Sequence, residues 1–255
     1  MDPELRDKFI QLWSKYFDGA ELPICLFYSD DAKWAEQRHP AKGHRCMVGD
    51  LAVVCRGGTV ALDKEAIGCF GGRRYLGFDQ TIRPNFEYFL SCGIPGQMEG
   101  ERYKKTPEIV REIMAKATPF TAPARFAVFK RWDKLEEAEQ PEVVIFFAPP
   151  DVLSGLYTLA GFDQTESNTV IAPFGAGCST IVQHPYLEKD RPNPRAFLGM
   201  FDVSARPCVP AGVLSFAVPM KKFVGMVDNM DQSFLITGSW AKVLRRIQKD
   251  SQKSE

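Results

Sequence analysis

The sequence predicts an α+β fold, a mixed sheet with flanking helices, and two kinds of pattern lead to this class. Short apolar runs rich in β-branched and aromatic residues are typical of buried strands. Segments with apolar residues at helical spacing are typical of helices that cover a sheet. The composition, 45% apolar and 25% charged over 255 residues, is that of a globular chain long enough for one large domain or two closely packed halves.

The chain begins with a predicted amphipathic helix over residues 3–18. Its apolar side chains share one face at helical spacing: Leu5, Phe9, Leu12, Trp13 and Tyr16. A strand is predicted at 23–28, and the polar segment 34–43 is predicted as a loop with a short helical turn.

Two cysteines fall in the next predicted elements. Residues 46–55 predict a buried helix that opens with Cys46 and is stopped by Gly57 and Gly58. Cys69 lies beside Gly71 and Gly72. The other elements predicted here are a strand at 59–62, a loop or strand at 73–78 and a helix at 109–116, whose start is marked by Thr106 and Pro107.

The second half of the chain predicts a similar mixture of elements. They are, in order, a strand at 142–148, a helix at 152–160 capped by Asp151, a strand at 169–172, a helix at 178–183 opened by Cys178, strands at 195–203 and 213–218, and an amphipathic helix at 233–248.

The two halves, 1–130 and 131–255, resemble each other in pattern. Residues 24–28 parallel 144–148, and Cys46 opens an apolar helix as Cys178 does. We hypothesise that the halves arose by internal duplication and form one compact unit around a central cleft. A coincidence of common apolar patterns is the alternative. Under duplication, Cys46 and Cys178 would be equivalent positions, and a site between the halves would be natural.

Charge and hydropathy exclude several classes of partner. Lys and Arg together number 32, as do Asp and Glu, so no net charge favours nucleic acid or anionic lipid. The N-terminal residues lack a basic region followed by an apolar run, and no apolar run approaches ~18 residues. We therefore expect a cytoplasmic protein that binds neither nucleic acid nor membrane. In that compartment the seven cysteines are expected as free thiols, metal ligands or redox-active groups.

Cys178 is the most informative residue. A β-branched run ends in Gly175-Ala176-Gly177, and the cysteine follows where a helix is expected to begin. A thiol at a helix N-terminus is close to unpaired N–H groups and the positive end of the helix dipole, which favour the thiolate. Such a sulfur can ligate a metal, attack an electrophile or remain a small buried side chain.

The chain resembles the domain of unknown function 169 family, also described as an uncharacterised archaeal conserved region. One matching position is Cys46. The other matches are short runs: Cys69-Phe-Gly-Gly, Leu76-Gly-Phe, Val144-Ile-Phe-Phe-Ala-Pro-Pro, Ala172-Pro-Phe-Gly-Ala-Gly-Cys-Ser, Leu198-Gly-Met-Phe-Asp-Val-Ser-Ala-Arg, Phe216-Ala-Val-Pro-Met and Met230-Asp-Gln-Ser-Phe-Leu. They extend over nearly the whole chain. The resemblance implies cysteines at the positions of Cys46, Cys69 and Cys178, but not at the other four. It also implies an association with anaerobic organisms, where iron–sulfur chemistry is common.

These three cysteines are the predicted ligands of an iron–sulfur cluster or metal. Glycines beside Cys69 and Cys178 permit the close backbone approach that sulfur ligands need. Three thiolates would leave one position for a substrate, water or fourth ligand, with His44 and His184 as the nearest candidates. There is no Cys-X-X-Cys pair, and the ligands would be dispersed along the chain.

Two other chemistries compete with this one. Cys178 could be a nucleophile with His184 or His44 as its base, although a spacing of six residues does not place Cys178 and His184 on one helical face. Alternatively, the turn at Gly175 and Gly177 could bind an anion with help from arginines, of which Arg73 and Arg206 are the principal candidates, and Arg74 and Arg195 further ones. It lacks the third glycine of a dinucleotide fingerprint, since Thr180 stands there. In the simplest alternative, all seven cysteines are buried core residues.

The sequence thus predicts a cytoplasmic protein that holds an iron–sulfur cluster or metal between its halves and performs redox or Lewis-acid chemistry on a small molecule of unknown identity. The alternative is a non-catalytic small-molecule or cofactor carrier with an anion site at Gly175–Cys178. Assembly into a homo-oligomer remains open in both.

Overall fold

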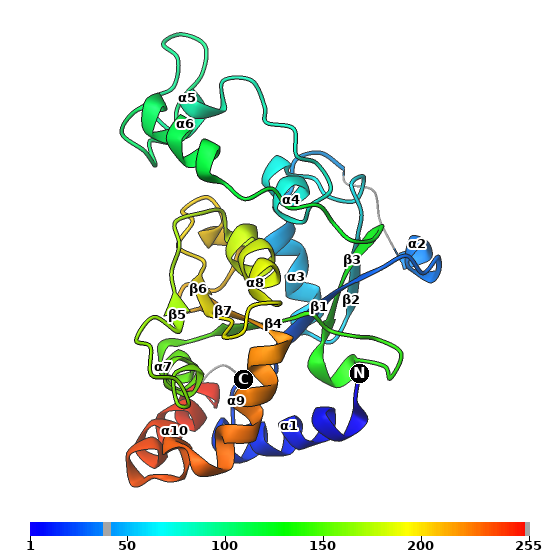
Figure 1. Cartoon of the computed structure of the whole chain (residues 1–255), viewed down its shortest axis with the longest axis vertical. Coiled ribbons are helices and arrows are strands. Elements are labelled where there is room, and N and C mark those ends of the chain that lie inside the picture. The colour runs from blue at the N-terminus through cyan, green and yellow to red at the C-terminus, as the bar shows by residue number, and fades with distance from the viewer. Residues whose placement is uncertain (38–41, 253–255) are drawn as a thin grey trace.

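A computed structural model describes residues 1–37 and 42–252, and its centre is one mixed sheet of seven strands (Figure 1). The order across the sheet is β2-β3-β1-β4-β7-β6-β5; only the β5–β6 pair is parallel. The strands are β1 (Ile24–Ser29), β2 (Thr59–Leu62), β3 (Phe126–Arg131), β4 (Val143–Ala148), β5 (Val170–Ile171), β6 (Ala196–Gly199) and β7 (Leu214–Pro219). The predicted α+β class is confirmed.

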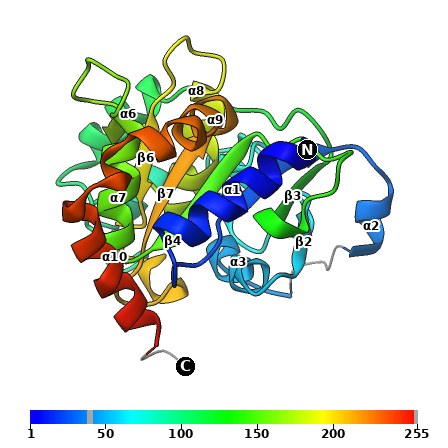
Figure 2. The same ribbon diagram turned by 90° about the horizontal axis from the view of Figure 1, so that it is seen from below.

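Helices α1 (Pro3–Tyr16), α7 (Pro150–Ala160), α9 (Met220–Asn229) and α10 (Gly238–Ser251) cover one face of the sheet (Figure 2). Their apolar stripes meet the strand side chains in an aromatic core, in which Phe9 lies edge-on to Trp132 at 5.1 Å between ring centroids. Asp2 caps α1 by accepting a hydrogen bond from the Glu4 amide at 2.9 Å, and Pro3 fits the first turn because its missing N–H needs no partner.

The other face is covered by α3 (Met47–Cys55), α4 (Phe70–Tyr75), the π-helical turn η2 (Ser179–Gln183) and α8 (His184–Glu188). Helix α3 is the centre of this layer. The buried residues of α3 recur at helical spacing and contact the apolar side chains of β1, β3 and β4. These α3 residues are Met47, Val48, Leu51 and Val54. Because both faces are covered, the central strands are buried on both sides.

The two halves of the chain lie side by side in the sheet. Counted outward from the centre, the first half contributes β1, β3 and β2, and the second contributes β4, β7, β6 and β5. In each half the first strand is central, the last is next to it and an intermediate one lies outside. This agreement in order does not establish a duplication, which remains a hypothesis.

An arm formed by residues 79–121 projects from the body and carries α5 (Phe86–Phe89) and α6 (Pro107–Lys116) (Figure 1). Its base is closed by a hydrogen bond from the Ala122 amide to the Gly77 carbonyl at 3.0 Å. Gly77 has a φ of +84°, and a Cβ there would lie 2.3 Å from the Ala122 nitrogen, so this close approach requires glycine.

Several elements differ from the sequence expectation. The predicted loop or strand at 73–78 begins as the end of helix α4, and the C-terminal helix starts at Gly238, capped by Thr237, after a 3₁₀ turn, η5 (Phe234–Ile236). Asp151 lies within the first turn of α7 rather than at its cap. Strand β6 is shorter than predicted. Part of the predicted loop 34–43 lies outside the described residues, and its start belongs to helix α2 (Lys33–Gln37).

No helix within the described ranges has both the length and the hydropathy required to cross a membrane.

Candidate functional site

Five of the seven cysteines lie in the layer that contains α3. Cys69, Cys178 and Cys208 lie close to Cys46, and we call these four cysteines the thiol centre. They arise from loops that connect different strands. Cys46 lies between β1 and β2, Cys69 between β2 and β3, Cys178 between β5 and β6, and Cys208 between β6 and β7. Three of them occupy the residue that precedes a helix: Cys46 before α3, Cys69 before α4 and Cys178 before η2.

The side chains of Cys46 and Cys69 interact directly with each other. The segments that carry them touch through their backbones, because a Cβ on Gly68 would lie 2.9 Å from the Arg45 nitrogen. The Cys69 sulfur also accepts backbone N–H groups from Met47 and, at 3.3 Å, from Gly72. Cys46 and Cys69, which the sequence predicts as two members of one site, therefore lie next to each other.

The pair is electrostatically asymmetric. The interaction with Cys69 lowers the pKa of Cys46, and the Val48 amide adds to this effect against the opposing cost of burial. The same interaction, followed by burial, raises the pKa of Cys69.

Cys178 completes the set of three predicted from sequence. Its sulfur lies under α4, where a Cβ on Gly71 would be 3.9 Å from it. Burial raises the pKa of Cys178, and the nearby Cys69 and Asp202 charges raise it further. The amides of Cys178 and Ser179 favour the thiolate. The helix that follows is a π-helix, a rare conformation that is frequent at functional sites.

Cys208 is the member of the centre that sequence reasoning missed. It ends the 3₁₀ turn η3 (Arg206–Cys208), and its sulfur would lie 3.8 Å from a Cβ on Gly49, in the first turn of α3. The missed signal was positional: Cys208 lies between β6 and β7, as Cys69 lies between the corresponding strands β2 and β3.

The glycine turn before Cys178 is filled by the chain itself. The Gly177 amide donates to the Asp202 carboxylate at 3.1 Å, which occupies the position that an anion would take. A Cβ on Gly177 would lie 3.0 Å from the Met200 sulfur, and one on Gly175 would lie 2.6 Å from the Ser179 hydroxyl. Both glycines therefore allow close packing around the turn.

The predicted arginines lie in the same layer but bind carbonyl groups of the chain. Arg206 donates to the carbonyls of Pro210, Ala211 and Val213, and so holds the loop that follows Cys208. Arg73 Nε donates to the Ile67 carbonyl at 3.0 Å, across the segment that carries Cys69. Their clearest contribution is to fix the loops of the thiol centre.

The two candidate histidines differ in environment. His184 is half-buried, with its ring stacked on Phe197 at 5.5 Å, and burial lowers its pKa. His44 is exposed, two residues before Cys46. Among the described residues, no hydrogen bond joins either histidine to a cysteine of the thiol centre.

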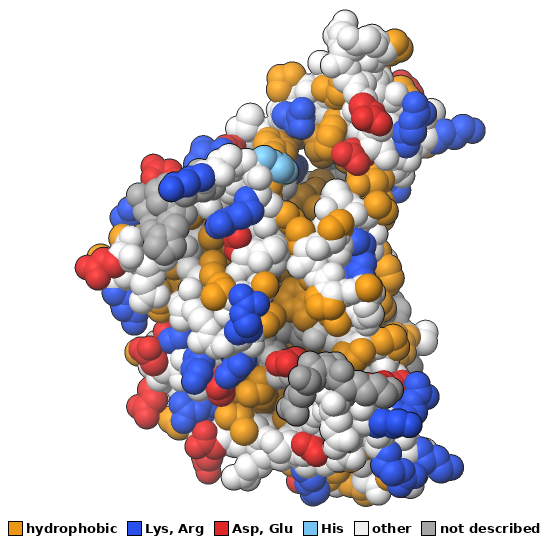
Figure 3. All heavy atoms as spheres, turned by 180° about the vertical axis from the view of Figure 1, so that it is seen from behind, with side chains coloured by type: hydrophobic (Ala, Val, Ile, Leu, Met, Phe, Trp, Pro, Cys, Tyr) orange, Lys and Arg blue, Asp and Glu red, His pale blue; other side chains and the backbone are white. Residues whose placement is uncertain are grey.

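The arm contacts residues next to the thiol centre on two sides. The Phe70 ring, adjacent to Cys69, lies 6.2 Å from the Phe86 ring of the arm. Phe174, four residues before Cys178, contacts Tyr103 and lies beneath the Lys104 ammonium at 3.8 Å. Figure 3 shows hydrophobic side chains gathered where the arm meets the body. The arm thus packs against the segments that carry Cys69 and Cys178.

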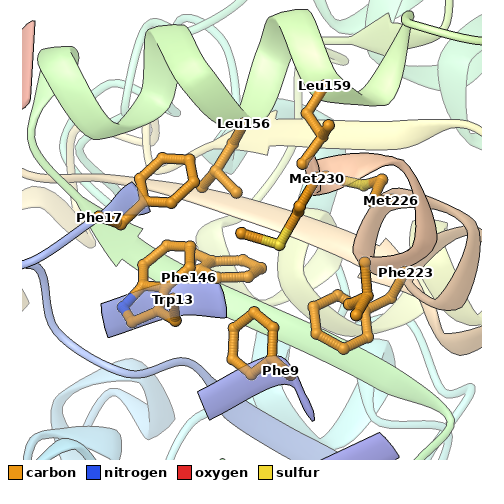
Figure 4. A pocket seen from close by; sticks show the side chains of 10 residues that line it. Phe9, Trp13, Phe17, Phe146, Leu156, Leu159, Phe223, Met226 and Met230 are labelled. Carbon is orange, nitrogen blue, oxygen red and sulfur yellow. The ribbon is translucent and has the colours of Figure 1, made fainter. Parts of the chain in front are cut away.

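Two hollows lie away from the thiols. A cavity of about 10 Å³ lies among the apolar side chains of α1, β4, α7 and α9, on the opposite face of the sheet (Figure 4). It has room for about one water molecule and offers no polar partner, so it is a packing void. An open hollow of about 470 Å³ lies over the loop 92–102 of the arm.

The sulfurs are neighbours but are not preassembled around an ion. In residues 1–37 and 42–252, no three His, Cys, Asp or Glu side chains are already arranged to hold a metal. Cys46 and Cys69 instead interact with each other. Metal binding would replace that interaction.

Comparison with known families supports the sequence resemblance. The family DUF169, described as "Uncharacterised ArCR", matches residues 15–229. The chain belongs to the DUF169 family. The matched region contains all four cysteines of the thiol centre. No curated protein and no solved structure matches the chain.

Proposed function

We propose that this DUF169 protein holds an iron–sulfur cluster or a thiolate-bound metal at its thiol centre and uses it for redox or Lewis-acid chemistry on a small molecule. The observation that supports this proposal most is the meeting of four cysteines from four separate loops. Four thiolates are the usual ligand set of an iron–sulfur cluster. A set of sulfurs that only filled core space would have no need of such a convergence.

The chemistry of the donors also fits such a group. Backbone N–H groups of Val48, Met47, Gly72 and Ser179 point at the sulfurs of Cys46, Cys69 and Cys178. Hydrogen bonds to sulfur stabilise thiolates and tune the potential of a cluster. Cys46, Cys69 and Cys178 would be three ligands, and Cys208 is the best candidate for the fourth. With four thiolate ligands, a bound cluster would supply electron transfer; with three, and Cys208 unbound, one iron would be open to a small molecule.

The surroundings suggest how a substrate would reach the site. Cys46, Cys69 and Cys208 are partly exposed, whereas Cys178 is only 5% exposed. A small molecule would therefore reach Cys46, Cys69 and Cys208 more readily than Cys178. We place this activity in the cytoplasm, since all seven cysteines are free thiols, as is usual in reducing compartments.

Anaerobic purification tests this proposal. The wild-type chain is expected to be brown and to contain iron and acid-labile sulfide, with absorbance near ~400 nm lost on oxidation. Cys46→Ser, Cys69→Ser and Cys178→Ser should each lose most of the iron, and Cys208→Ser should retain a smaller or labile cluster.

The matched control is Cys55→Ser, which removes a partly buried cysteine from the other end of α3. It should keep the full iron content. Colourless wild-type protein after anaerobic reconstitution with iron and sulfide, and without any other bound transition metal, would contradict the proposal.

A further inference from the structure

The Cys46–Cys69 pair has the geometry of a dithiol, independent of any bound metal. The two side chains interact directly, and the Cys69 sulfur lies next to Met47, the residue after Cys46, since both are within 3.0 Å of a Cβ built on Gly72. The backbones that carry them are in contact, since Gly68 has no side chain to separate them from Arg45. Bridging two cysteines needs this closeness of the main chains.

We propose that Cys46 and Cys69 form a reversible disulfide by exchange with a low-molecular-weight disulfide, such as glutathione disulfide. This activity goes beyond the proposed metal site and needs only the two thiols. A consequence for that site rests on the proposed function: a disulfide between two ligands would empty the centre of its metal.

The exchange balances in two steps. The Cys46 thiolate attacks one sulfur of the small disulfide, which breaks its S–S bond, releases one small thiolate and leaves a mixed disulfide on Cys46. The Cys69 thiol then loses its proton to solvent. Its sulfur attacks Cys46, forms the protein disulfide and displaces the second small thiolate. The protein dithiol is oxidised by two electrons, and the small disulfide is reduced to two thiols.

The order of attack follows from how the two sulfurs are held. The Gly72 amide donates to the Cys69 sulfur at 3.3 Å and fixes it in place, so Cys46 is the sulfur that is freer to attack, and Cys69 is positioned to resolve the mixed disulfide. Both sulfurs are partly exposed. Cys178 is nearly inaccessible, so a small disulfide should not react there first.

The test uses the full-length chain, purified with reductant and a chelator so that no metal is bound. After removal of the reductant, glutathione disulfide is added, free thiols are alkylated and the peptides are mapped by mass spectrometry without reduction. The chain should lose two of its seven thiols and show one Cys46–Cys69 bond that dithiothreitol reverses. Cys69→Ala should instead accumulate glutathione on Cys46, and Cys55→Ala should behave as wild type.

A second variant tests the geometry without removing a thiol. In Gly68→Ala, the added Cβ would lie 2.8 Å from the Gly43 carbonyl oxygen and should push the two segments apart. Disulfide formation should slow several-fold, while far-UV circular dichroism stays unchanged. Absence of the Cys46–Cys69 bond in the wild type, or a bond to Cys178 or Cys208 in its place, would overturn this inference. Because the protein is metal-free, the result is independent of whether iron binds.

Discussion

The sulfurs of the thiol centre differ in how readily each becomes a thiolate. The pKa of Cys46 is lowered by its interaction with Cys69, whereas the pKa values of Cys69 and Cys178 are raised. Metal binding needs deprotonated sulfurs, and binding therefore releases protons. Cys69 and Cys178 would each release a proton, and Cys46 would release less.

His184 predicts a pH dependence of stability. Burial lowers its pKa below the ordinary value of about 6.5, so the unfolded chain takes up the proton at a higher pH than the folded chain. The stability that the neutral His184 ring contributes is fully present above the pKa of the unfolded chain. It is lost as the pH falls from that pKa through the lower pKa of the folded protein. The free energy of unfolding, measured with urea, should therefore decrease between pH 7.5 and pH 5, by at most about 1.4 kcal/mol per pH unit from this group.

The comparison with His184→Gln isolates this residue from the other acidic and basic groups. The variant should lose less stability than the wild type over the same interval, because its side chain takes up no proton. An equal loss in the two proteins would show that His184 does not contribute to the pH dependence.

At the residue scale, the sequence singled out three of the four cysteines of the thiol centre, and their role as metal ligands stays a prediction. Cys69 and Cys178 were recognisable because their glycine neighbours allow close backbone approach, and Cys46 by the family resemblance and its place before an apolar helix. Cys208 has no such neighbours. Its place in the centre depends on the order of strands in the sheet, which no local pattern encodes.

At the element scale, helices with their own end signals were predicted well. Helix α6 begins where Thr106 accepts a hydrogen bond from the Ile109 amide, as its sequence indicates. Helix α9 and strand β3 were missed. Helix α9 has no side-chain cap and contains Gly225, and β3 contains Lys130, a charge that is buried because Glu139 pairs with it at 2.9 Å.

The close contact between α7 and α10 predicts that a larger residue at Gly155 destabilises the protein. A Cβ on Gly155 would lie 2.4 Å from the Trp240 ring and 2.8 Å from the Phe17 ring, both of which are buried. Gly155→Ala should therefore destabilise the protein by about 1–3 kcal/mol, since neither ring can move without disturbing the core. Urea unfolding measures the change.

Gly225→Ala is the matched control for this prediction. Gly225 also lies within a helix, but nothing stands within 4 Å of the Cβ it would gain. The variant should be as stable as the wild type or more stable by up to about 1 kcal/mol, because alanine favours the helix. If the two variants had the same free energy of unfolding, the prediction that α7 packs tightly against α10 at Gly155 would be contradicted.

At the scale of the whole molecule, the two halves share one core. Phe9 of the first half lies 4.9 Å from Phe223 and 6.5 Å from Phe146 of the second, measured between ring centroids. Strands β1 and β4 join the halves in one sheet, with Ile24 opposite Ile145. The thiol centre likewise takes two sulfurs from each half.

This shared core predicts that neither half folds alone. Fragments 1–131 and 132–255 would each expose the aromatic side chains that the other covers, along with an unpaired strand edge at β1 or β4. Each fragment alone should lack near-UV circular dichroism and a cooperative unfolding transition, and co-expression should restore both. A cooperative transition in either fragment alone would show that the halves are separate domains.

The sequence by itself determined the class of fold, most of the helices and strands, the family and three of the thiols. These follow from local periodicity, end signals and residue types, which act over a few positions. Only the tertiary structure decided that four thiols meet, that Cys46 and Cys69 form a pair, and that Asp202 fills the turn before Cys178. The physical reason is that these contacts join connections far apart in the chain, and the order and packing of the strands bring them together.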